Sequence, residues 1–364
     1  MVKSKILLST LLTTAIATSA GAALAQTSVT MEGVADGFAG SMRNSGDAAS
    51  TSKIGSGGLS TSYIGFKGSE DLGGGLKASF TLGAFYRIDD GASGRFNGDT
   101  FFARDANVAL SNQYGKITLG RMTPPTTLPL YMFNPIEDSF TLSPLVLHAI
   151  VGTSVFPGTF GKTDSAWSNS IRYTSPTFAG ITVNLHYQFG EAAGNSSKNN
   201  KGANVLYQNG ALGLGLAYHD VQVGNPVDNP IVPNGPSVML SVPVAGGPNL
   251  VATRQKLTFI GGSYDLAFMK LFATYDRATH NVDLKDQTGT LGVSVPAGSG
   301  KFLAAVAQTK RESTVFDDLK RTTVSVGYDY FLSKRTDLYA FVMSDKTTNY
   351  ANAGSFAVGM RHRF

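Results

Sequence analysis

The sequence predicts an all-β protein, a single antiparallel meander of sixteen strands in one large sheet. Sixteen segments alternate apolar and polar side chains with period two, as expected for strands that have one apolar and one polar face. The connections between them alternate between short turns and long loops, so each strand pairs with the next in an up-and-down order. An even number of strands places both chain ends at the rim that carries the short turns.

The clearest strand covers residues 181–189, where apolar side chains take the odd positions and polar side chains such as Asn184 and His186 the even ones. Residues 76–82 and 323–330 repeat this pattern. Short turns are expected near residues 69–73, 112–114, 176–179, 209–211, 266–268, 296–299 and 332–335, and long loops near 40–57 and 88–99. The predicted strands are 27–39, 58–68, 74–87, 100–111, 115–122, 168–175, 180–189, 202–209, 212–220, 255–265, 269–277, 288–295, 300–309, 322–331, 336–345 and 354–364.

The composition fits a sheet that faces lipid on one side. Charged residues make up only 15%, against about a quarter in typical soluble domains, and there are 42 glycines and no cysteine. A secreted soluble β-sandwich fits the same composition, although its loops are shorter. Aromatic placement favours the membrane, because Tyr and Phe recur at strand ends as in the interfacial belts of membrane proteins. Examples are Tyr328, Tyr330, Phe331, Tyr339 and Phe341.

Residues 1–25 are predicted to be a signal peptide cleaved after Ala25. Lys3 and Lys5 precede an apolar run, and Ala23 and Ala25 form a small-x-small cleavage site. The alternative, a membrane-spanning helix, needs about twenty apolar residues, and this run is shorter and interrupted by hydroxyl side chains. Cleavage leaves 28 basic and 25 acidic residues scattered along the chain, which gives no indication of nucleic-acid binding.

The last strand, residues 354–364, alternates apolar and polar side chains and ends on the aromatic Phe364. It resembles the closing strand of a Gram-negative general outer-membrane porin, and residues 68–77, 172–176, 291–296 and 328–339 resemble the betaproteobacterial, Neisseria-like branch. The resemblance implies a sixteen-stranded antiparallel transmembrane β-barrel, a homotrimer in the outer-membrane lipids of a Gram-negative bacterium, and a third long loop folded into the lumen. It also makes Phe364 an assembly signal read by the barrel-assembly machinery.

The third long loop lies between Met122 and Trp167 and reads neither as strand nor as a convincing helix. It carries too many apolar side chains to remain in water, so it must pack against something. The resemblance implies that such a loop forms a constriction in which acidic loop residues face basic wall residues. Glu137 and Asp138 are the acidic candidates.

On the wall of this constriction, the resemblance assigns Arg172 and Arg104, and Lys67 adds a third positive charge. Tyr63 stands where the family usually carries another arginine, so the basic cluster is expected to be smaller. The alternation of residues 104–110 points Arg104 toward lipid, which requires a bulge or the end of the apolar band to bring it inside. For Arg172 the alternation agrees with an inward position.

The predicted function is passive diffusion of ions and small hydrophilic solutes through a water-filled channel with weak anion preference. The alternative is a substrate-specific channel, which would line its lumen with aromatics such as Phe38 and Phe85. No catalytic grouping, cofactor motif or metal-ligand spacing is recognised, and the five histidines are scattered. The pairs Asp89–Asp90 and Asp317–Asp318 are expected to be solvated loop carboxylates, with a calcium ion as the alternative.

Overall fold

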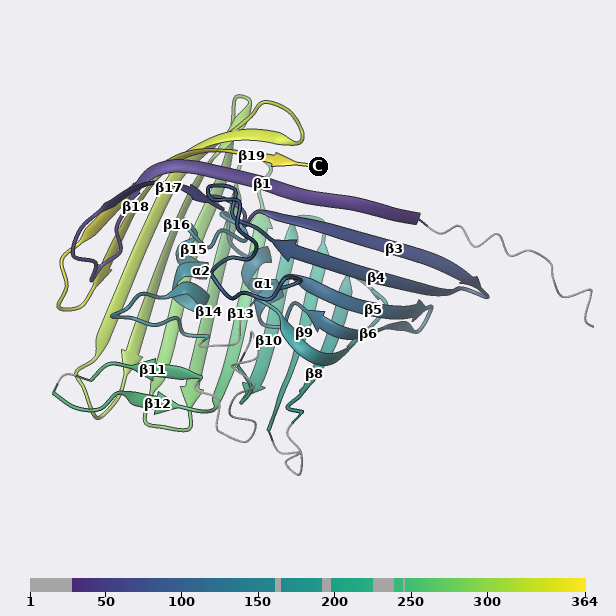
Figure 1. Ribbon diagram of the computed structural model, residues 1–364, viewed down its shortest axis with the longest axis horizontal. Coiled ribbons are helices and arrows are strands. Elements are labelled where there is room, and N and C mark those ends of the chain that lie inside the picture. The colour runs from purple at the N-terminus through teal and green to yellow at the C-terminus, as the bar shows by residue number, and fades with distance from the viewer. Residues whose placement is uncertain (1–27, 161–164, 192–197, 225–238, 245) are drawn as a thin grey trace, which may run out of the picture.

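The computed structural model describes residues 28–160, 165–191, 198–224, 239–244 and 246–364 (Figure 1). The predicted signal peptide and its cleavage site at Ala25 lie outside these residues. Within the described part of the chain, no helix is both long enough and apolar enough to cross a membrane.

The wall is one antiparallel sheet that closes on itself. The first strand, β1 (Ser28–Met42), pairs with the last, β19 (Ala353–Arg363), from Val34 opposite Arg363 to Ser41 opposite Phe356. The described sheet has 17 strands, but β2 (Thr51–Ser56) and β3 (Tyr63–Gly73) pair with successive halves of β1 and together form one wall strand. The barrel therefore has the sixteen wall strands that the sequence predicts.

Each remaining wall strand pairs with its neighbours in chain order. They are β4 (Leu76–Phe85), β5 (Asp105–Asn112), β6 (Gly115–Met122), β7 (Trp167–Thr174), β8 (Ile181–Phe189), β9 (Asn199–Asn209), β10 (Leu212–Val221), β13 (Gln255–Asp265), β14 (Lys270–His280), β15 (Lys285–Ala297), β16 (Gly300–Glu312), β17 (Leu319–Phe331) and β18 (Thr336–Thr347). A separate hairpin of β11 (Leu240–Val242) and β12 (Leu250–Ala252) lies in the connection from β10 to β13 and was not predicted.

Alternation along the strands separates an outer from an inner face. On β5, Val108 and Leu110 are more than half exposed, whereas Asn107 and Ala109 on the other face pair with inward residues of β4 and β6. Across the barrel, inward Thr323 and Ser325 of β17 are fully buried. Because the exposed side chains of the outer face are apolar, this face is the surface that contacts lipid.

Short turns join the strands at the rim where both ends of the wall lie. Between β3 and β4, Gly73, Gly74 and Gly75 all have positive φ, at 83°, 60° and 80°. Residues with a Cβ rarely adopt this conformation, so three glycines permit a turn that links the two strands directly.

The wall departs from prediction at residues 57–62. The sequence pattern predicts a strand over 58–68, but these residues leave the sheet as a turn between β2 and β3, and we call them the inward turn. Gly57 begins it with a φ of 76°. Its contacts are made by residues distant in sequence, which explains why local alternation did not reveal it.

Candidate channel constriction

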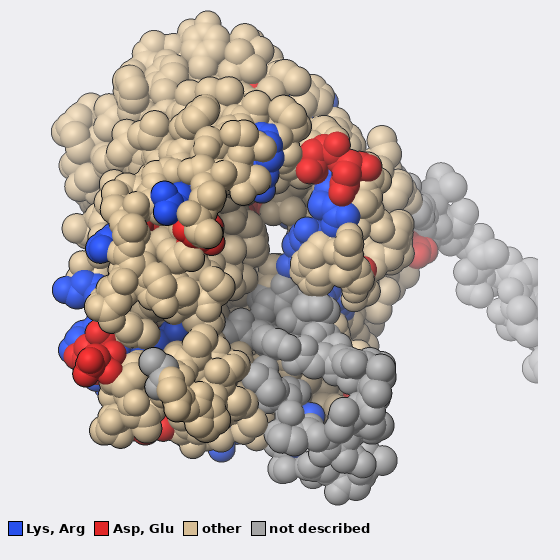
Figure 2. Space-filling view, turned by 60° about the vertical axis from the view of Figure 1, so that its left-hand side comes forward, with Lys and Arg blue, Asp and Glu red and all other residues tan. Residues whose placement is uncertain are grey.

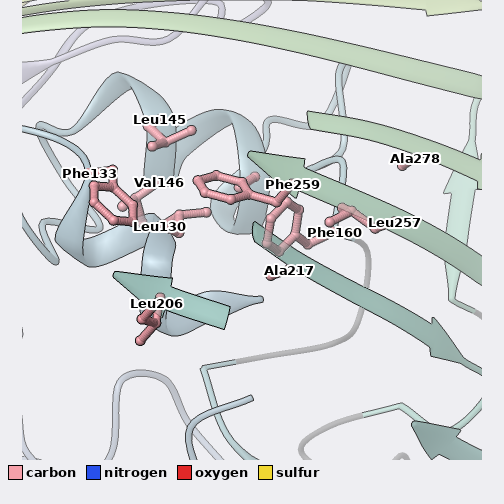
Figure 3. Packing of buried hydrophobic residues seen from close by; sticks show 11 residues of the cluster. Leu130, Phe133, Leu145, Val146, Phe160, Leu206, Ala217, Leu257, Phe259 and Ala278 are labelled. Carbon is pink, nitrogen blue, oxygen red and sulfur yellow. The ribbon is translucent and has the colours of Figure 1, made fainter. Parts of the chain in front are cut away.

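The described parts of the connection from β6 to β7, residues 123–160 and 165–166, fold back onto the inward side chains of the wall, and we call them the inner segment. It contains α1 (Thr127–Met132), α2 (Pro144–Val146) and the π-helical turn η1 (Leu147–Val151), none of which the sequence pattern indicated. Figure 3 shows its Leu130, Phe133, Leu145 and Val146 beside Leu206, Ala217 and Phe259 of the wall.

Inward glycines on two wall strands make room for this packing. A Cβ at Gly215 of β10 would lie 2.4 Å from the Phe133 ring, and one at Gly261 of β13 would lie 2.9 Å from it. Further along the inner segment, Ile136 and Leu142 pack with Phe38 of β1, Leu303 of β16 and Phe341 of β18. The inner segment is therefore attached by apolar contacts to two separate parts of the wall.

Two buried ion pairs of the wall fix the second half of the inner segment. Arg311 pairs with Asp286 at 2.7 Å and donates to the carbonyl oxygen of Pro157 at 2.9 Å. Arg321 pairs with Asp345 at 2.9 Å and donates to the carbonyl oxygen of Leu147 at 3.2 Å. All four side chains are fully buried, and each arginine also donates to a backbone carbonyl of the inner segment, although Nη1 of Arg311 has no hydrogen-bond partner among the described residues.

His148 of the inner segment lies between these two pairs. Its ring nitrogens are 2.7 Å from the Thr309 hydroxyl and 2.8 Å from the Thr323 hydroxyl. Burial, and secondarily the positive charge of Arg321, hold the pKa of His148 well below its usual range. The neutral ring therefore acts as a structural hydrogen-bonding group in this position.

The first half of the inner segment rests on the inward turn, which is held by Asp36 of β1. The carboxylate of Asp36 accepts hydrogen bonds from the backbone N–H groups of Gly58, Leu59 and Ser60 at 2.8–3.0 Å, and from the Tyr339 hydroxyl. Ser139 of the inner segment then donates to the carbonyl oxygen of Gly58 at 2.6 Å. One buried carboxylate thus positions the turn on which the tip of the inner segment sits.

The basic wall residues lie on the side of the barrel formed by β3 to β7. Arg172 faces inward from β7, opposite Thr118 and His186, and donates to the carbonyl oxygen of Thr123 at 3.2 Å. Arg104 immediately precedes β5, and its guanidinium lies 3.6 Å from the ring centre of the inward Tyr63. Because Arg104 lies before the strand begins, the alternation that pointed it toward lipid does not apply, and its side chain lies on the inner side.

Unlike Arg172, the basic residues Lys67 and Arg104 each lie close to a carboxylate. Lys67 faces inward from β3 and pairs with Glu32 of β1, and Arg104 lies 3.7 Å from the carboxylate of Asp105. Within the described residues, no carboxylate lies within ion-pair distance of Arg172, and its Nε has no hydrogen-bond partner. Tyr63, which replaces an expected arginine, contributes an aromatic surface under Arg104 instead of a charge.

The acidic candidates of the inner segment occupy different environments. Glu137 has a φ of 46°, its side chain is 54% exposed, and Lys301 of β16 lies 3.8 Å away. Asp138 is partly buried and accepts a hydrogen bond of 3.1 Å from Ser60 of the inward turn. Burial first, and the neighbouring charge of Glu137 second, raise the pKa of Asp138 above its ordinary value of 3.8.

Sequence reasoning missed several charged residues that complete this arrangement. Arg361 of β19 donates to Ser60 at 2.8 Å and pairs with Asp337 at 3.1 Å, and Lys301 is the partner of Glu137. Lys116 of β6 faces inward opposite Thr174, two positions from the residue opposite Arg172. The alternation of apolar and polar residues along the strands is enough to place these side chains on the inward face. Their proximity to the inner segment depends on how that segment folds.

Figure 2 shows a narrow opening through the molecule, with Lys and Arg side chains gathered along one side of it. In the loop pairs Asp89–Asp90 and Asp317–Asp318, Asp90 pairs with Arg87 and Asp318 with Lys310. In the part of the chain that the structure describes, no group of three or more His, Asp or Glu side chains is arranged to hold a metal ion.

Comparison with known proteins agrees with this architecture. Residues 12–350 match the family model described as Gram-negative porin. Outer membrane porin protein 32 of Delftia acidovorans is 30% identical, covering 96% of this chain and 93% of that protein. Major outer membrane protein P.IB of Neisseria meningitidis is 26% identical over 83% of each chain.

Among solved structures, the anion-selective porin from Comamonas acidovorans superimposes with a TM-score of 0.72 at 25% identity, covering 93% of this chain and all of that one. The agreement of sequence and fold extends over nearly the whole described barrel. The chain therefore belongs to the Gram-negative porin family and forms a diffusion channel in the outer membrane.

Proposed function

We propose that this chain is a general porin, which passes ions and small hydrophilic solutes by size with only a mild preference for anions. The observation that carries the proposal is the charge balance around the inner segment. Lys67, Arg104 and Lys301 each have a carboxylate within 4 Å, whereas Arg172 has none among the described residues. Arg172 and the inward Lys116, for which the described residues likewise offer no ion-pair partner, favour anions, but less strongly than a cluster of free arginines.

The related Comamonas structure is named anion-selective, which supports the sign of this preference. Tyr63 supports a weak anion preference, because it stands where the family usually carries a positively charged arginine. Its ring also covers one face of the Arg104 guanidinium. The residues proposed to set selectivity are therefore Arg104, Arg172 and Lys67 on the wall, with Tyr63 beneath Arg104, against Glu137 and Asp138 on the inner segment.

A substrate-specific channel is the second candidate, but most of its expected aromatic lining is buried. Phe38 is only 3% exposed and packs with Leu59 and Ile136, and Phe85 is 7% exposed beneath the guanidinium of Arg95. Phe133, Phe156 and Phe160 of the inner segment are fully buried. These aromatic side chains stabilise the inner segment and the wall instead of presenting a surface to solutes.

We infer a channel and not an outer-membrane enzyme. The most suggestive pair is Ser170 and His186, whose hydroxyl and Nε2 lie 2.9 Å apart. The Nδ1 atom of His186 has no hydrogen-bond partner, so no carboxylate orients the ring, and Ser170 donates instead to the carbonyl oxygen of Gly120. A nucleophile needs a base held by a third group, and this pair lacks one.

We also propose that the chain assembles as a homotrimer, on the strength of family membership. A small outward residue on β1 could let neighbouring barrels approach closely. At Gly33, however, the ring of Phe364 of the same chain occupies that space, because an added Cβ would lie 2.4 Å from it. A native mass measurement in mild detergent that finds only the monomer would contradict this part of the proposal.

Liposome swelling with neutral sugars of increasing size tests the general-porin proposal. We expect swelling rates that fall smoothly with the size of the sugar and rise in proportion to its concentration. The reason is that the side chains of a sixteen-stranded barrel do not fill its lumen. Saturation with one sugar, or one sugar that passes out of size order, would favour the specific channel. Empty liposomes, and liposomes with heat-unfolded protein, are the controls.

A further inference from the structure

A chain of hydrogen bonds runs along the inner face of the wall beneath the second half of the inner segment, with His148 as its central member. On one side, Nε2 of His148 lies 2.8 Å from the hydroxyl of Thr323 on β17, which donates to the carboxylate of Asp345 on β18. On the other side, Nδ1 lies 2.7 Å from the hydroxyl of Thr309 on β16, and this hydroxyl lies 3.0 Å from that of Thr288 on β15. The chain therefore crosses four wall strands, and we call it the hydroxyl chain.

The direction of each hydrogen bond in the hydroxyl chain follows from its fixed end at Asp345. Thr323 gives its only hydroxyl proton to that carboxylate, so Nε2 of His148 carries a hydrogen atom and donates to Thr323. Because the buried ring is neutral, Nδ1 is an acceptor, and Thr309 donates to it. The proton of Thr309 is used in this way, so Thr288 donates to Thr309 and has no proton left for another group.

The other end of the hydroxyl chain faces Asp276 of β14, which lies directly opposite Thr288. Asp276 is fully buried, and within the described ranges neither of its carboxyl oxygens has a hydrogen-bond partner. The hydroxyls of Thr274 and Thr290, on the same inward face, are likewise buried without partners. An ionised carboxylate at this position would therefore lack any donor, which is a costly arrangement in a protein interior.

The charged groups around Asp276 do not supply the missing partner. Asp286, two positions from Thr288 on β15, is itself negative. Arg311 and Arg321 are each paired with another carboxylate, at 2.7 and 2.9 Å. The neighbouring strand β13 presents the apolar ring of Phe259 opposite Asp276. The titratable and charged groups of the described residues that face Asp276 or the hydroxyl chain are His148, His280, Asp286, Arg311, Arg321 and Asp345.

We propose that Asp276 carries a proton at neutral pH and donates it to Thr288, and that loss of this proton at alkaline pH loosens the second half of the inner segment. A proton needs no additional space, whereas a metal ion or a water molecule would need a cavity beside carboxyl oxygens that are completely covered. If the hydroxyl chain ran in the opposite direction, the proton would sit on Nδ1 of His148. Burial and the positive charge of Arg321 disfavour that arrangement.

Ionisation of Asp276 would act on the inner segment through its apolar contacts. Phe259, opposite Asp276, packs in one cluster with Phe160 and Leu130 of the inner segment (Figure 3). A negative charge beside this cluster is stabilised only when water reaches it, and water reaches it when the inner segment moves away from the wall. This inference concerns the attachment of the inner segment and does not depend on the ion preference of the channel.

Infrared spectroscopy of the full-length protein, in a detergent without carbonyl groups, tests for the proton directly. At pH 7, the difference between the unaltered protein and Asp276→Asn should contain the carbonyl band of a neutral carboxyl group. Thr288→Val should keep this band but shift it to higher frequency, because the O–H group loses its acceptor. The matched control Asp220→Asn removes a buried carboxylate that is paired with Arg254 at 2.6 Å, and it should leave the band unchanged.

Thermal unfolding followed by circular dichroism from pH 6 to pH 10 measures the effect of the proton on stability. The native protein holds a proton that an unfolded aspartate lacks in this range, so stability falls as the pH rises, until Asp276 ionises. Below that point, the unfolding temperature of the unaltered protein should fall by about 2 °C more per pH unit than that of Asp276→Asn, whose amide group cannot ionise. At alkaline pH, single-channel records should show partial closures in the unaltered protein and not in this variant.

Two outcomes would overturn the proposal. The first is a difference spectrum without a neutral carboxyl band, which would mean that Asp276 is ionised. The second is an equal dependence of the unfolding temperature on pH in the unaltered protein and in Asp276→Asn. A normal circular dichroism spectrum of each variant at pH 7 shows that the barrel has folded.

Discussion

At the scale of single residues, Asp36 holds the inward turn beside the constriction. Its carboxylate accepts three backbone N–H groups of the inward turn, which in turn carries the tip of the inner segment. A carboxylate satisfies several donors at once because each oxygen offers two acceptor sites. The position of Glu137 and Asp138 therefore depends on a residue of the first strand.

Replacing Asp36 with Asn should lower stability by about 1–3 kcal/mol, because the amide group that replaces one oxygen cannot accept an N–H group. Thermal unfolding followed by circular dichroism measures the loss, and the loosened turn should also increase current noise in single-channel records. Asp71→Asn is the matched control, since Asp71 accepts only the N–H of Gly73 in an exposed turn. Identical unfolding temperatures for the two variants would contradict the role assigned to Asp36.

If Asp138 contributes to selectivity as proposed, the ion preference should depend on pH. Because its pKa is raised, mainly by burial, it takes up a proton at a higher pH than an ordinary aspartate, with its usual value of 3.8. As pH falls through this raised pKa, the constriction loses a negative charge, and anion preference should increase. Reversal potentials between pH 7 and pH 4 measure the increase.

In Asp138→Asn this charge is absent at every pH, so the rise between pH 7 and pH 4 should be smaller and the preference at pH 7 already higher. A variant curve that follows that of the unaltered protein would assign the titration to another group.

At the scale of elements, the sequence predicted the wall strands better than what the wall encloses. Alternation identified the sixteen wall strands because each side chain there contacts either lipid or the interior, a property that repeats every second residue. The inner segment has no such repeat, so its short helices were missed. Its apolar content did predict that it packs against something.

The missed parts share a physical cause, which is contact between residues far apart in the chain. The inward turn forms because residues 58–60 bind Asp36, and alternation within residues 58–68 cannot report that contact. Arg311 and Arg321 were readable as inward, but their complete burial follows from the carbonyl groups of the inner segment that cover them. The direction of the Arg104 side chain could not be read from the sequence, because β5 begins one residue after it and the alternation of the strand does not apply to it.

The second half of the inner segment should depend on the two buried ion pairs. Replacing Arg311 or Arg321 with Gln leaves the buried carboxylate of Asp286 or Asp345 without its positive counterpart, which costs about 3–5 kcal/mol. We expect a lower unfolding temperature and frequent partial closures in single-channel records. Lys310→Gln, which changes an exposed neighbour of Arg311, should leave both unchanged.

If the arginine variants unfolded at the normal temperature and gave quiet channels, the apolar contacts alone would hold the segment. The buried pairs would then have no role in fixing it.

At the scale of the whole molecule, the chain end and the barrel closure meet at Phe364. Its backbone N–H and carbonyl groups bond with Gly33 of β1, and its ring lies over Gly33 on the outer face. Phe364→Leu retains most of the apolar burial, whereas deletion of Phe364 removes the terminal aromatic entirely.

If Phe364 is read by the assembly machinery, both variants should reach the outer membrane at reduced levels. The protein that does arrive, or that is refolded in detergent, should conduct normally. Quantifying outer-membrane fractions by immunoblot tests this, with Phe356→Leu, another outward aromatic of β19, as the control. Normal surface levels of the deletion variant would refute the targeting role.

The central claim for the whole channel is that Arg172 on the wall and the acidic pair on the inner segment set its selectivity. A charge a few ångströms from the ion path changes an ion's energy by about 1 kcal/mol, or about fivefold in relative permeability. The effect of each charge on relative permeability should shrink at high salt, because mobile ions screen exposed charges. Lys334→Gln, on the short-turn rim, should have no effect.

Reversal potentials in a salt gradient across a planar bilayer test this claim most directly. We predict mild anion preference for the unaltered protein, stronger preference for the double variant Glu137→Gln, Asp138→Asn, and a loss or reversal of preference for Arg172→Ser. Reversal potentials that do not shift in either variant would mean that these side chains do not face the ion path, and would contradict the account.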